Sequence, residues 1–180
     1  LGANAVPICL PIGAEDKFQG IVDLLARKAY FYDTTDNLVN YELKDVPESM
    51  VNEVEEWRNK LIEAAAECDE ALMEKFFEDP DSISDEEVIA AIRKGTIAMQ
   101  IVPACCGSSF KNKGVQFLLD SVRRYLPSPL DKGLVKGVDP STGVETERQP
   151  SASEPFSALV FKIATDPFVG RLAFLRAYSG

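Results

Sequence analysis

The sequence predicts a mixed α/β fold, and three observations lead to this prediction. Between residues 50 and 72, apolar residues recur every three or four positions, as they do in an amphipathic helix. Residues 96–126 combine an apolar run, a loop of small residues and a second amphipathic segment, which is typical of half a parallel α/β unit. Residues 156–180 alternate around Asp166-Pro167, which predicts two strands of a β-sheet or barrel.

The first 46 residues have the composition of strands. Residues 5–13, AVPICLPIG, predict a buried strand that a proline and a glycine would end. Residues 20–33 and 37–46 predict two further strands around the polar turn Thr34–Asn37. The stretch IVDLLARKA within the first of these two segments also suits a helix, so both alternatives stay open there.

A long amphipathic helix is predicted to follow Pro47, a residue that suits the first helical position. Trp57 lies in its apolar stripe and is interpreted as a core anchor rather than a ligand platform. The stripe consists of Met50, Val54, Trp57, Leu61, Ala65, Cys68 and Leu72. Residues 69–77 either continue this helix or form a second one.

The next helix has clear signals at both ends. Ser84-Asp85-Glu86-Glu87 has the S-x-x-E pattern of a capping box, and apolar residues on either side of it are placed for a hydrophobic staple. Arg93 and Lys94 suit the negative end of a helix dipole, and Gly95 suits a left-handed stop. These features predict a helix that starts at Ser84 and ends at Gly95.

The segment TIAMQIVPACCGS, residues 96–108, predicts a strand buried on both faces. Residues 115–126 then predict a helix that Pro127 ends. Its inward residues are expected to be Val115, Leu118, Leu119, Val122 and Leu126. Residues 128–155 are rich in Pro, Gly, Ser and charge, and they predict a linker or a meander of short extended pieces at a domain boundary.

Composition excludes several classes of site. The chain has no histidine, and its four cysteines, at 9, 68, 105 and 106, form no C-x-x-C pair, which removes the usual zinc sites and every imidazole base. The cysteines are expected to be buried, reduced thiols of a cytoplasmic protein. The longest apolar run is far short of the roughly 20 residues of a membrane span, so no membrane partner is predicted. Leu1 is not an initiator Met and no leader is visible, which suggests a piece of a longer protein.

The formal net charge is −10, and the acidity is uneven. Residues 42–87 are crowded with carboxylates, offset only by Lys44, Arg58, Lys60 and Lys75. Such a surface repels the phosphates of nucleic acid and favours basic partners. The alternative interpretation is a solvated helical face without a partner.

No self-sufficient active site is predicted. The sequence contains no G-x-x-x-x-G-K-[ST], H-E-x-x-H or G-x-S-x-G motif, and its paired carboxylates, such as Glu55-Glu56, fall on exposed helical faces. The small-residue loop CCGSSFKNKGVQ, residues 105–116, is the remaining candidate. Small side chains let a backbone approach a ligand closely and leave N–H groups free to point at it.

This loop and several longer stretches resemble the bacterial elongation factor G family of translational GTPases. CGSSFKNKGVQ is similar to the last guanine-contacting element of GTPases, and GVQFLLDSVRRYLPSPLD to the last helix of the nucleotide domain. PIGAEDKFQGIVDLL resembles the segment that enters the family's inserted subdomain, and WRNKLIEAAAECDEALMEKF and SDEEVIAAIRKGTI resemble the insert's helices. FKIATDPFVGRLAFLRAYSG resembles the opening of the second domain, so the likeness covers essentially the whole chain.

The resemblance implies four segments. Residues 1–14 would be a strand of a partial P-loop-type nucleotide domain, and residues 15–98 an inserted α/β subdomain. Residues 99–130 would hold the C-terminal strand, guanine loop and helix of the nucleotide domain. Residues 131–180 would be a linker and the truncated start of β-barrel domain II.

The resemblance also implies a guanine-binding loop made by Gly107, Ser108, Ser109 and Phe110, with Lys111 beside the base. In this family a backbone N–H of the second small residue bonds the carbonyl oxygen of the base, and Ser109 stands where the family usually has Ala. No catalytic or metal-binding residue is implied, because the phosphate loop, magnesium-binding switches and N-K-x-D element do not occur in these 180 residues. GTP or GDP with magnesium would bind the parent, whereas the fragment is expected to be inactive and to bind no nucleotide.

The implied partner is the ribosome, through which the parent would move tRNA and mRNA with the energy of GTP. The acidic insert would dock on the basic stalk protein, and Arg171 and Arg176 of domain II could face small-subunit rRNA. Two alternatives remain: a non-catalytic interaction module that binds the stalk protein through residues 47–77, and a fragment of another translational GTPase, a ribosomal-protection protein or release factor. Exposed strand edges could also pair with a second copy and form a dimer.

Overall fold

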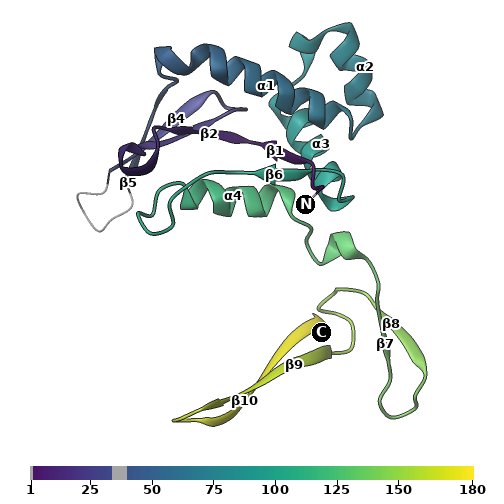
Figure 1. Cartoon of the computed structure of the whole chain (residues 1–180). Helices are drawn as coiled ribbons and strands as arrows, with labels where there is room; N and C mark the ends of the chain where they lie inside the picture. Colours follow the sequence, from purple (N-terminus) through teal and green to yellow (C-terminus); the bar gives the residue numbers. More distant parts are fainter. Residues whose placement is uncertain (1, 34–39) are drawn as a thin grey trace. The chain divides into compact units, whose positions relative to one another are not determined.

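The computed structural model describes residues 2–33 and 40–180, so the predicted turn Thr34–Asn37 lies outside the described residues. The described chain combines helices with small β-sheets, as an α/β prediction requires. It divides into two compact units, Leu1–Leu126 and Pro127–Gly180 (Figure 1). The finer division into four segments stays a prediction.

The first predicted strand is two short strands that pair with different partners. β1 (Ala5–Pro7) runs parallel to β6 (Val102–Ala104) in a two-stranded sheet. β2 (Cys9–Ile12) pairs antiparallel with β3 (Gly20–Asp23) and begins a second sheet. Ile8 separates the two strands, so a continuous apolar run changes sheets at a single residue.

Residues 20–33 form neither one strand nor a helix. β3 ends at Asp23, and β4 (Lys28–Asp33) returns antiparallel to it. The Asp23 carboxylate makes the turn, because its Oδ1 accepts the N–H of Leu25 at 2.9 Å and of Ala26 at 3.2 Å. This turn contains no Gly or Pro, which is why the sequence did not reveal it. β5 (Asn40–Asp45) completes a four-stranded antiparallel sheet of order β2-β3-β4-β5.

The apolar stripe from residue 50 to residue 72 is divided between two helices. A 3-10 turn (Glu48–Met50) leads into α1 (Val51–Ala66), so Pro47 precedes the helix instead of starting it. α2 (Glu70–Glu78) is a second helix, because the Asp69 side chain accepts the N–H of Ala71 and of Leu72 and so caps a new start. The open alternative at residues 69–77 is therefore resolved in favour of two helices.

α3 (Asp85–Ile97) confirms the capping box. Ser84 Oγ accepts the N–H of Glu87, and the Glu87 carboxylate accepts the N–H of Ser84 at 3.0 Å. The predicted stop at Gly95 is wrong, because the helix continues to Ile97. A Cβ on Gly95 would lie 2.4 Å from Cys68 Sγ, so the glycine lets α3 pack closely, and Met99 takes the left-handed conformation instead (φ 60°).

The strand predicted over residues 96–108 is much shorter and less buried than expected. Its first residues belong to α3, and β6 contains only Val102–Ala104. Val102 is 45% exposed, so the strand is not buried on both faces. An apolar run alone cannot distinguish the end of a helix from a buried strand.

The helix predicted after the loop is present as α4 (Val115–Tyr125), but its predicted inward face is wrong. The buried residues are Phe117, Ser121 and Tyr125. The residues expected to point inward are largely exposed: Leu118, Leu119, Val122 and Leu126. The sequence therefore predicted the helix correctly, but it predicted the wrong side of the helix to be buried.

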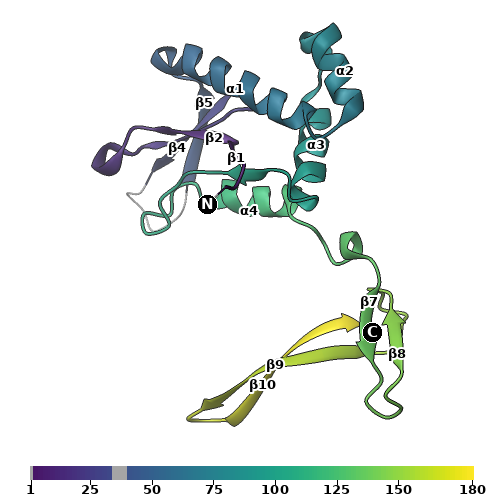
Figure 2. The same ribbon diagram turned by 45° about the vertical axis from the view of Figure 1, so that its right-hand side comes forward.

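α1 and α4 lie on opposite sides of the strands in both views (Figures 1 and 2). The core includes residues of the sheet, α1 and α4, and its most deeply buried side chains include Ile21, Val22, Leu24, Val54 and Leu61. On the α4 side, the ring of Phe117 meets the ring of Tyr30 on β4 edge-on, with centroids 6.0 Å apart. The sheet is thus covered by one helix on each side.

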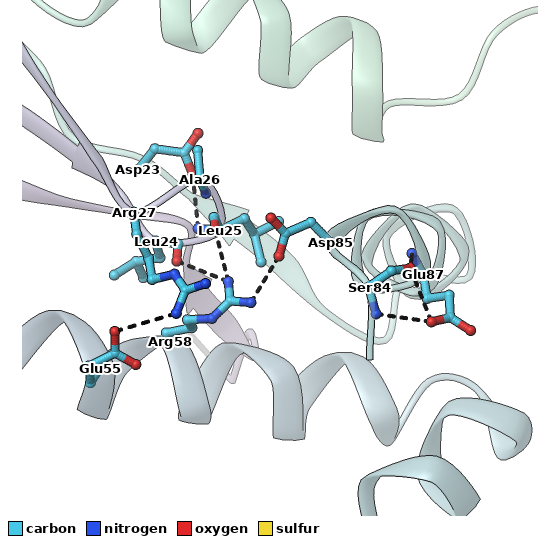
Figure 3. A network of polar contacts seen from close by, with 10 residues as sticks. All are labelled: Asp23, Leu24, Leu25, Ala26, Arg27, Glu55, Arg58, Ser84, Asp85 and Glu87. Atoms are coloured by element: carbon cyan, nitrogen blue, oxygen red, sulfur yellow. Dashed lines mark hydrogen bonds and ion pairs between the residues drawn. The ribbon is translucent and has the colours of Figure 1, made fainter. Parts of the chain in front are cut away.

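A buried arginine on α1 joins three elements (Figure 3). Arg58 is 9% exposed, and its Nη1 donates to the carbonyl oxygens of Leu24 at 3.3 Å and Leu25 at 2.9 Å, in the turn between β3 and β4. Its Nη2 lies 2.8 Å from Asp85 Oδ1 at the start of α3. One side chain therefore connects α1, the sheet and α3.

The second unit contains two hairpins. β7 (Val135–Val138) pairs with β8 (Glu145–Arg148), so this part of residues 128–155 is a meander of short strands rather than a plain linker. β9 (Ser157–Asp166) pairs with β10 (Gly170–Ser179), as the alternating pattern predicted. Asp166 Oδ1 accepts the N–H groups of Phe168 and Val169 and closes the turn.

None of the helices in residues 2–33 and 40–180 has the length and apolar character needed to cross a bilayer. The cysteines are free, and Cys9 and Cys68 are buried as expected. Cys105 is exposed, which contradicts the prediction that all four thiols are buried.

Candidate functional site

The candidate loop connects β6 to α4 and is closed on itself. The N–H of Ser108 donates to the carbonyl of Lys113 at 2.8 Å, and the N–H of Lys113 donates to the carbonyl of Ser108 at 2.9 Å. Inside this bridge, the N–H of Asn112 donates to the carbonyl of Ser109 at 3.2 Å, with Asn112 left-handed (φ 52°). The loop is therefore a small hairpin whose tip is Ser109, Phe110 and Lys111.

The tip offers main-chain donors to solvent. Ser109 is exposed and Phe110 is 99% exposed, whereas Ser108 is half-buried and its Oγ accepts the N–H of Lys111 at 3.3 Å. Across the part of the chain that the structure describes, the N–H groups of Ser109 and Phe110 have no hydrogen-bond acceptor. Unpaired N–H groups on a fixed, exposed turn can bind a carbonyl oxygen of a ligand.

Two glycines make the closure possible, and only one of them was identified from the sequence. Gly107 does not have a positive φ, but a Cβ on it would lie 2.8 Å from the carbonyl oxygen of Lys113. Gly114 precedes α4 with φ 84°, and a Cβ there would lie 3.0 Å from the carbonyl oxygen of Cys106. Gly107 is thus required by a close approach of the backbone, and the left-handed position is Gly114. A glycine directly before an amphipathic run was the available signal.

The first residues of the loop are held by a thiol of β2. The N–H of Cys106 donates to Cys9 Sγ at 3.3 Å, and the two sulfurs are 3.6 Å apart. The hydrogen bond to Cys106 and burial raise the pKa of Cys9, so this thiol stays protonated. The same hydrogen bond lowers the pKa of Cys106. The pair ties the beginning of the loop to the sheet.

The far side of the loop is held by two lysines. Lys113 Nζ donates to the carbonyl oxygen of Phe18 at 2.9 Å, although the two residues are 95 positions apart. Lys111 Nζ lies 3.8 Å from Asp16 Oδ1. Phe18 and Asp16 belong to the turn between β2 and β3, and no local pattern in the sequence points to either contact.

The geometry supports binding of a ligand that accepts hydrogen bonds better than catalysis. The loop contains no carboxylate, and it places Ser109 and Phe110 together at the tip, with Gly107 and Ser108 beneath. Among residues 2–33 and 40–180, no three His, Cys, Asp or Glu side chains are arranged to hold a metal ion. The loop residues can donate to a carbonyl oxygen of a ligand, and the loop has no carboxylate that could hold a magnesium ion.

The acidic surface of α1 and α2 is a second candidate, and its three cations each pair with one carboxylate. Arg58 is buried, Lys60 pairs with Glu56, and Lys75 pairs with Glu87, so these cations do not offset the remaining carboxylates. Within the described residues, six exposed carboxylates of this surface have no ion pair: Glu53, Glu63, Glu67, Glu70, Glu74 and Glu78. Uneven charge of this kind favours a basic partner.

Comparison with known proteins finds relatives along the whole chain. No protein-family model matches it. Elongation factor G of Cytophaga hutchinsonii is 56% identical and that of Amoebophilus asiaticus 54% identical over all 180 residues, which are 26% and 25% of those proteins. A crystal structure of a Thermus thermophilus protein has a TM-score of 0.75 at 29% identity, over 98% of this chain and 23% of that one. By sequence, the chain is a segment of the elongation factor G family that spans about a quarter of the length of the curated relatives it matches.

Proposed function

We propose that this chain supplies the guanine-side edge of the nucleotide site in a translational GTPase of the elongation factor G type. In the whole protein, bound GTP with magnesium would drive the movement of tRNA and mRNA through the ribosome in the cytoplasm. The observation that carries the proposal is the pair of unbonded N–H groups, of Ser109 and Phe110, at the tip of a closed loop in the described part of the chain. The match to elongation factor G along the whole chain supports it.

The chain by itself is proposed to be inactive. Phosphoryl transfer depends on a loop lysine and magnesium ions that position the γ-phosphate, and no phosphate-loop motif occurs in the sequence. Calorimetric titration of the isolated chain with GDP should give no measurable heat of binding. Binding in the micromolar range would show that the chain contains more of the nucleotide site than proposed.

The guanine assignment can be tested with Gly107→Ala in the full-length protein that contains this chain. The new Cβ would lie 2.8 Å from the carbonyl oxygen of Lys113 and would force open the Ser108–Lys113 bridge. The Kd for GDP should rise about tenfold, which corresponds to about 1.4 kcal/mol. Gly137→Ala is the matched control, because a Cβ on Gly137 would meet nothing within 4 Å. Equal affinities of the two variants would refute the assignment.

The four segments implied by the resemblance remain part of the proposal. Residues 1–14 and 99–130 would belong to the nucleotide domain, residues 15–98 to the insert, and residues 131–180 to the beginning of the barrel domain. Arg171 and Arg176 are exposed on β10 and are proposed to face small-subunit rRNA. Neither residue has an ion pair among the described residues, which leaves both charges available for phosphate.

A second function is proposed for the acidic surface of α1 and α2. The observation that favours it is the group of carboxylates on these two helices that have no ion pair within the described residues, beside the 79% exposed ring of Phe77. We propose that this surface docks on the basic globular domain of the ribosomal stalk protein. Nucleotide plays no part in this interaction, so the isolated chain should retain it.

Titration of the purified chain with the stalk protein's globular domain tests this second function. Binding should weaken clearly between low and moderate salt, because exposed charges are screened over about 10 Å at 0.1 M ionic strength. A variant with Glu67→Gln, Glu70→Gln and Glu74→Gln should lose most of the affinity, whereas Glu145→Gln and Glu147→Gln on β8 should not. Binding that is absent, or insensitive to salt, would contradict the proposal.

A further inference from the structure

The contact between Lys113 and Phe18 connects the candidate base-binding loop to a segment far away in the sequence. Lys113 contributes twice to the loop: its backbone closes the bridge with Ser108, and its ammonium donates to the carbonyl oxygen of Phe18 at 2.9 Å. Phe18 follows a 3-10 turn (Glu15–Lys17), where the chain passes from β2 to β3. The same residue therefore fixes the loop internally and to its surroundings.

The acceptor is held in a defined position. Gly13 begins the turn with φ 79°, and a Cβ on it would lie 2.1 Å from the carbonyl oxygen of Lys17. The N–H of Lys17 donates to the carbonyl of Ala14 at 2.9 Å, and the N–H of Gln19 donates to that of Ile12 at 2.8 Å. These bonds close the turn between the paired ends of β2 and β3, so the hairpin determines where the Phe18 carbonyl lies.

The second contact between the loop and the turn, an ion pair, is weaker. Lys111 Nζ is 3.8 Å from Asp16 Oδ1, and the Asp16 side chain is fully exposed. Exposed pairs of this length contribute little, because solvent and salt screen them. Lys113, which is half-buried and has a backbone acceptor, is therefore the residue that sets the position of the loop relative to the turn.

We propose that Lys113 is a positioning residue for guanine-nucleotide binding: it fastens the loop 105–114 to the turn 13–18, so that the conformation of the turn sets the affinity of the loop. The inference rests on the proposed function of the loop and adds a route by which the insert acts on it. Since coupling between binding sites is reciprocal, nucleotide bound to the loop also stabilises the turn.

The first test is Lys113→Met in the full-length protein, with the Kd for GDP as the measurement. Loss of one hydrogen bond from a charged donor should raise the Kd roughly threefold to tenfold, while the midpoint of thermal unfolding changes little. Lys113→Arg, which keeps a cationic donor of similar length, should restore most of the affinity. Lys17→Met, an exposed lysine on the turn itself, should leave the Kd unchanged.

The outcomes distinguish this inference from the guanine assignment. If Lys113→Met leaves the Kd unchanged while Gly107→Ala raises it, the positioning role is refuted and the guanine assignment stands. If neither variant changes the Kd, both are refuted. If Lys113→Arg is as weak as Lys113→Met, the effect does not come from a donor to Phe18 and the inference also fails.

A second test approaches the contact from the turn. Gly13→Ala introduces a Cβ 2.1 Å from the Lys17 carbonyl and displaces the turn without touching the loop. It should raise the Kd for GDP by about the same factor as Lys113→Met. The double variant should bind as the single variants do, since both remove the same contact. Additive effects of the two substitutions would overturn the inference.

Discussion

Arg58 shows how one buried cation determines the arrangement of the elements around it (Figure 3). A guanidinium has five N–H donors in a fixed plane, and here they meet two carbonyl oxygens of the β3–β4 turn and the carboxylate of Asp85. The turn carbonyls have no strand partner of their own among the described residues, so the arginine satisfies them. A lysine, with a single compact ammonium, could not reach all three acceptors.

Replacement of Arg58 by Met should therefore destabilise the first unit by about 2 to 3 kcal/mol, because it leaves buried acceptors unpaired. Urea unfolding followed by the fluorescence of Trp57, the only tryptophan, measures this directly. Arg27→Met is the matched control, since its pair with Glu55 is long, at 3.9 Å, and exposed. Similar losses for the two variants would show that the Arg58 contacts contribute no more than a surface pair.

Glu87 makes the cap of α3 sensitive to pH. The hydrogen bond from Lys75 and those from Ser84 lower its pKa from 4.5 to about 2. A carboxyl whose pKa is lower in the folded state stabilises the fold above its unfolded pKa, and this contribution is lost as the pH falls through the folded value. The window for Glu87 therefore lies between pH 4.5 and about 2.

The change that isolates this charge is Glu87→Gln, because glutamine can still accept the N–H of Ser84 in a capping box. The native chain should be more stable than the variant at neutral pH, and the difference should shrink as the pH falls below 4.5. Urea unfolding at a series of pH values gives the difference. If the difference in stability between the native chain and the variant stays constant from pH 4.5 to about 2, the charge of the carboxylate makes no contribution to stability.

At the scale of the element, sequence patterns predicted where helices begin better than which way they face. The capping box at Ser84 was predictable because its signal and its structure occupy the same four residues. The role of Gly95 was not, because it depends on the thiol of Cys68 on the segment after α1. The turn at Asp23 was also missed, since an aspartate side chain replaces the usual glycine.

α4 is the clearest case in which the helical period was predicted correctly and the buried side was predicted wrongly. Its leucines and Val122 are exposed in this chain, while Phe117, Ser121 and Tyr125 are buried and the ring of Phe117 contacts Tyr30 of the sheet. Apolar periodicity indicates that one face of a helix is buried against a neighbour, but it does not identify that neighbour. Two aromatic rings are large enough to anchor the helix from the less hydrophobic face.

This orientation predicts unequal effects on the stability of the isolated chain. Phe117→Ala should cost about 3 kcal/mol or more, because it empties a buried ring site against Tyr30. Leu119→Gln should change stability by less than about 0.5 kcal/mol, because Leu119 is 62% exposed. Thermal unfolding of the two variants checks this. If Leu119→Gln destabilised the chain more than Phe117→Ala, the buried face of α4 would be the one that apolar periodicity predicted.

For the candidate loop, the sequence predicted the local feature but not the long-range contacts. Small residues after a strand were enough to predict a bare stretch of main chain at Ser108 and Ser109. The contacts that hold it could not be predicted, because Cys9 and Phe18 lie 97 and 95 positions from their partners in the loop. Long-range contacts of this kind depend on the folded sheet, and no spacing within the loop encodes them.

At the scale of the whole molecule, the two units differ in how well they bury their apolar side chains. The first has a core with many fully buried residues, such as Ile21 and Leu61. In the second, β9 and β10 pair only with each other among the described strands, and both faces of the hairpin remain exposed. The most exposed apolar residues of β9 are Leu159, Phe161 and Ile163. Two strands alone are marginally stable in water.

The exposed hairpin leads to a prediction for the isolated chain in solution. Unpaired strand edges with apolar faces tend to pair with another copy, so the chain should dimerise with increasing concentration. Sedimentation velocity over about a hundredfold range of concentration measures this.

Because the register shifts at Phe161, Ile163 shares its face with Val160 and Leu175. Ile163→Lys places a charge on this face and should shift the equilibrium towards the monomer, because a like charge would then face the second copy.

The control for this prediction is Leu119→Gln, which removes a similarly exposed apolar side chain from the first unit. If association proceeds through the hairpin, this control should dimerise as the native chain does. If instead it suppresses the dimer while Ile163→Lys does not, the copies meet through α4, and the strand edges play no part. A chain that stays monomeric at every concentration would contradict the prediction, and the exposed faces of β9 and β10 would then be tolerated in water without a partner.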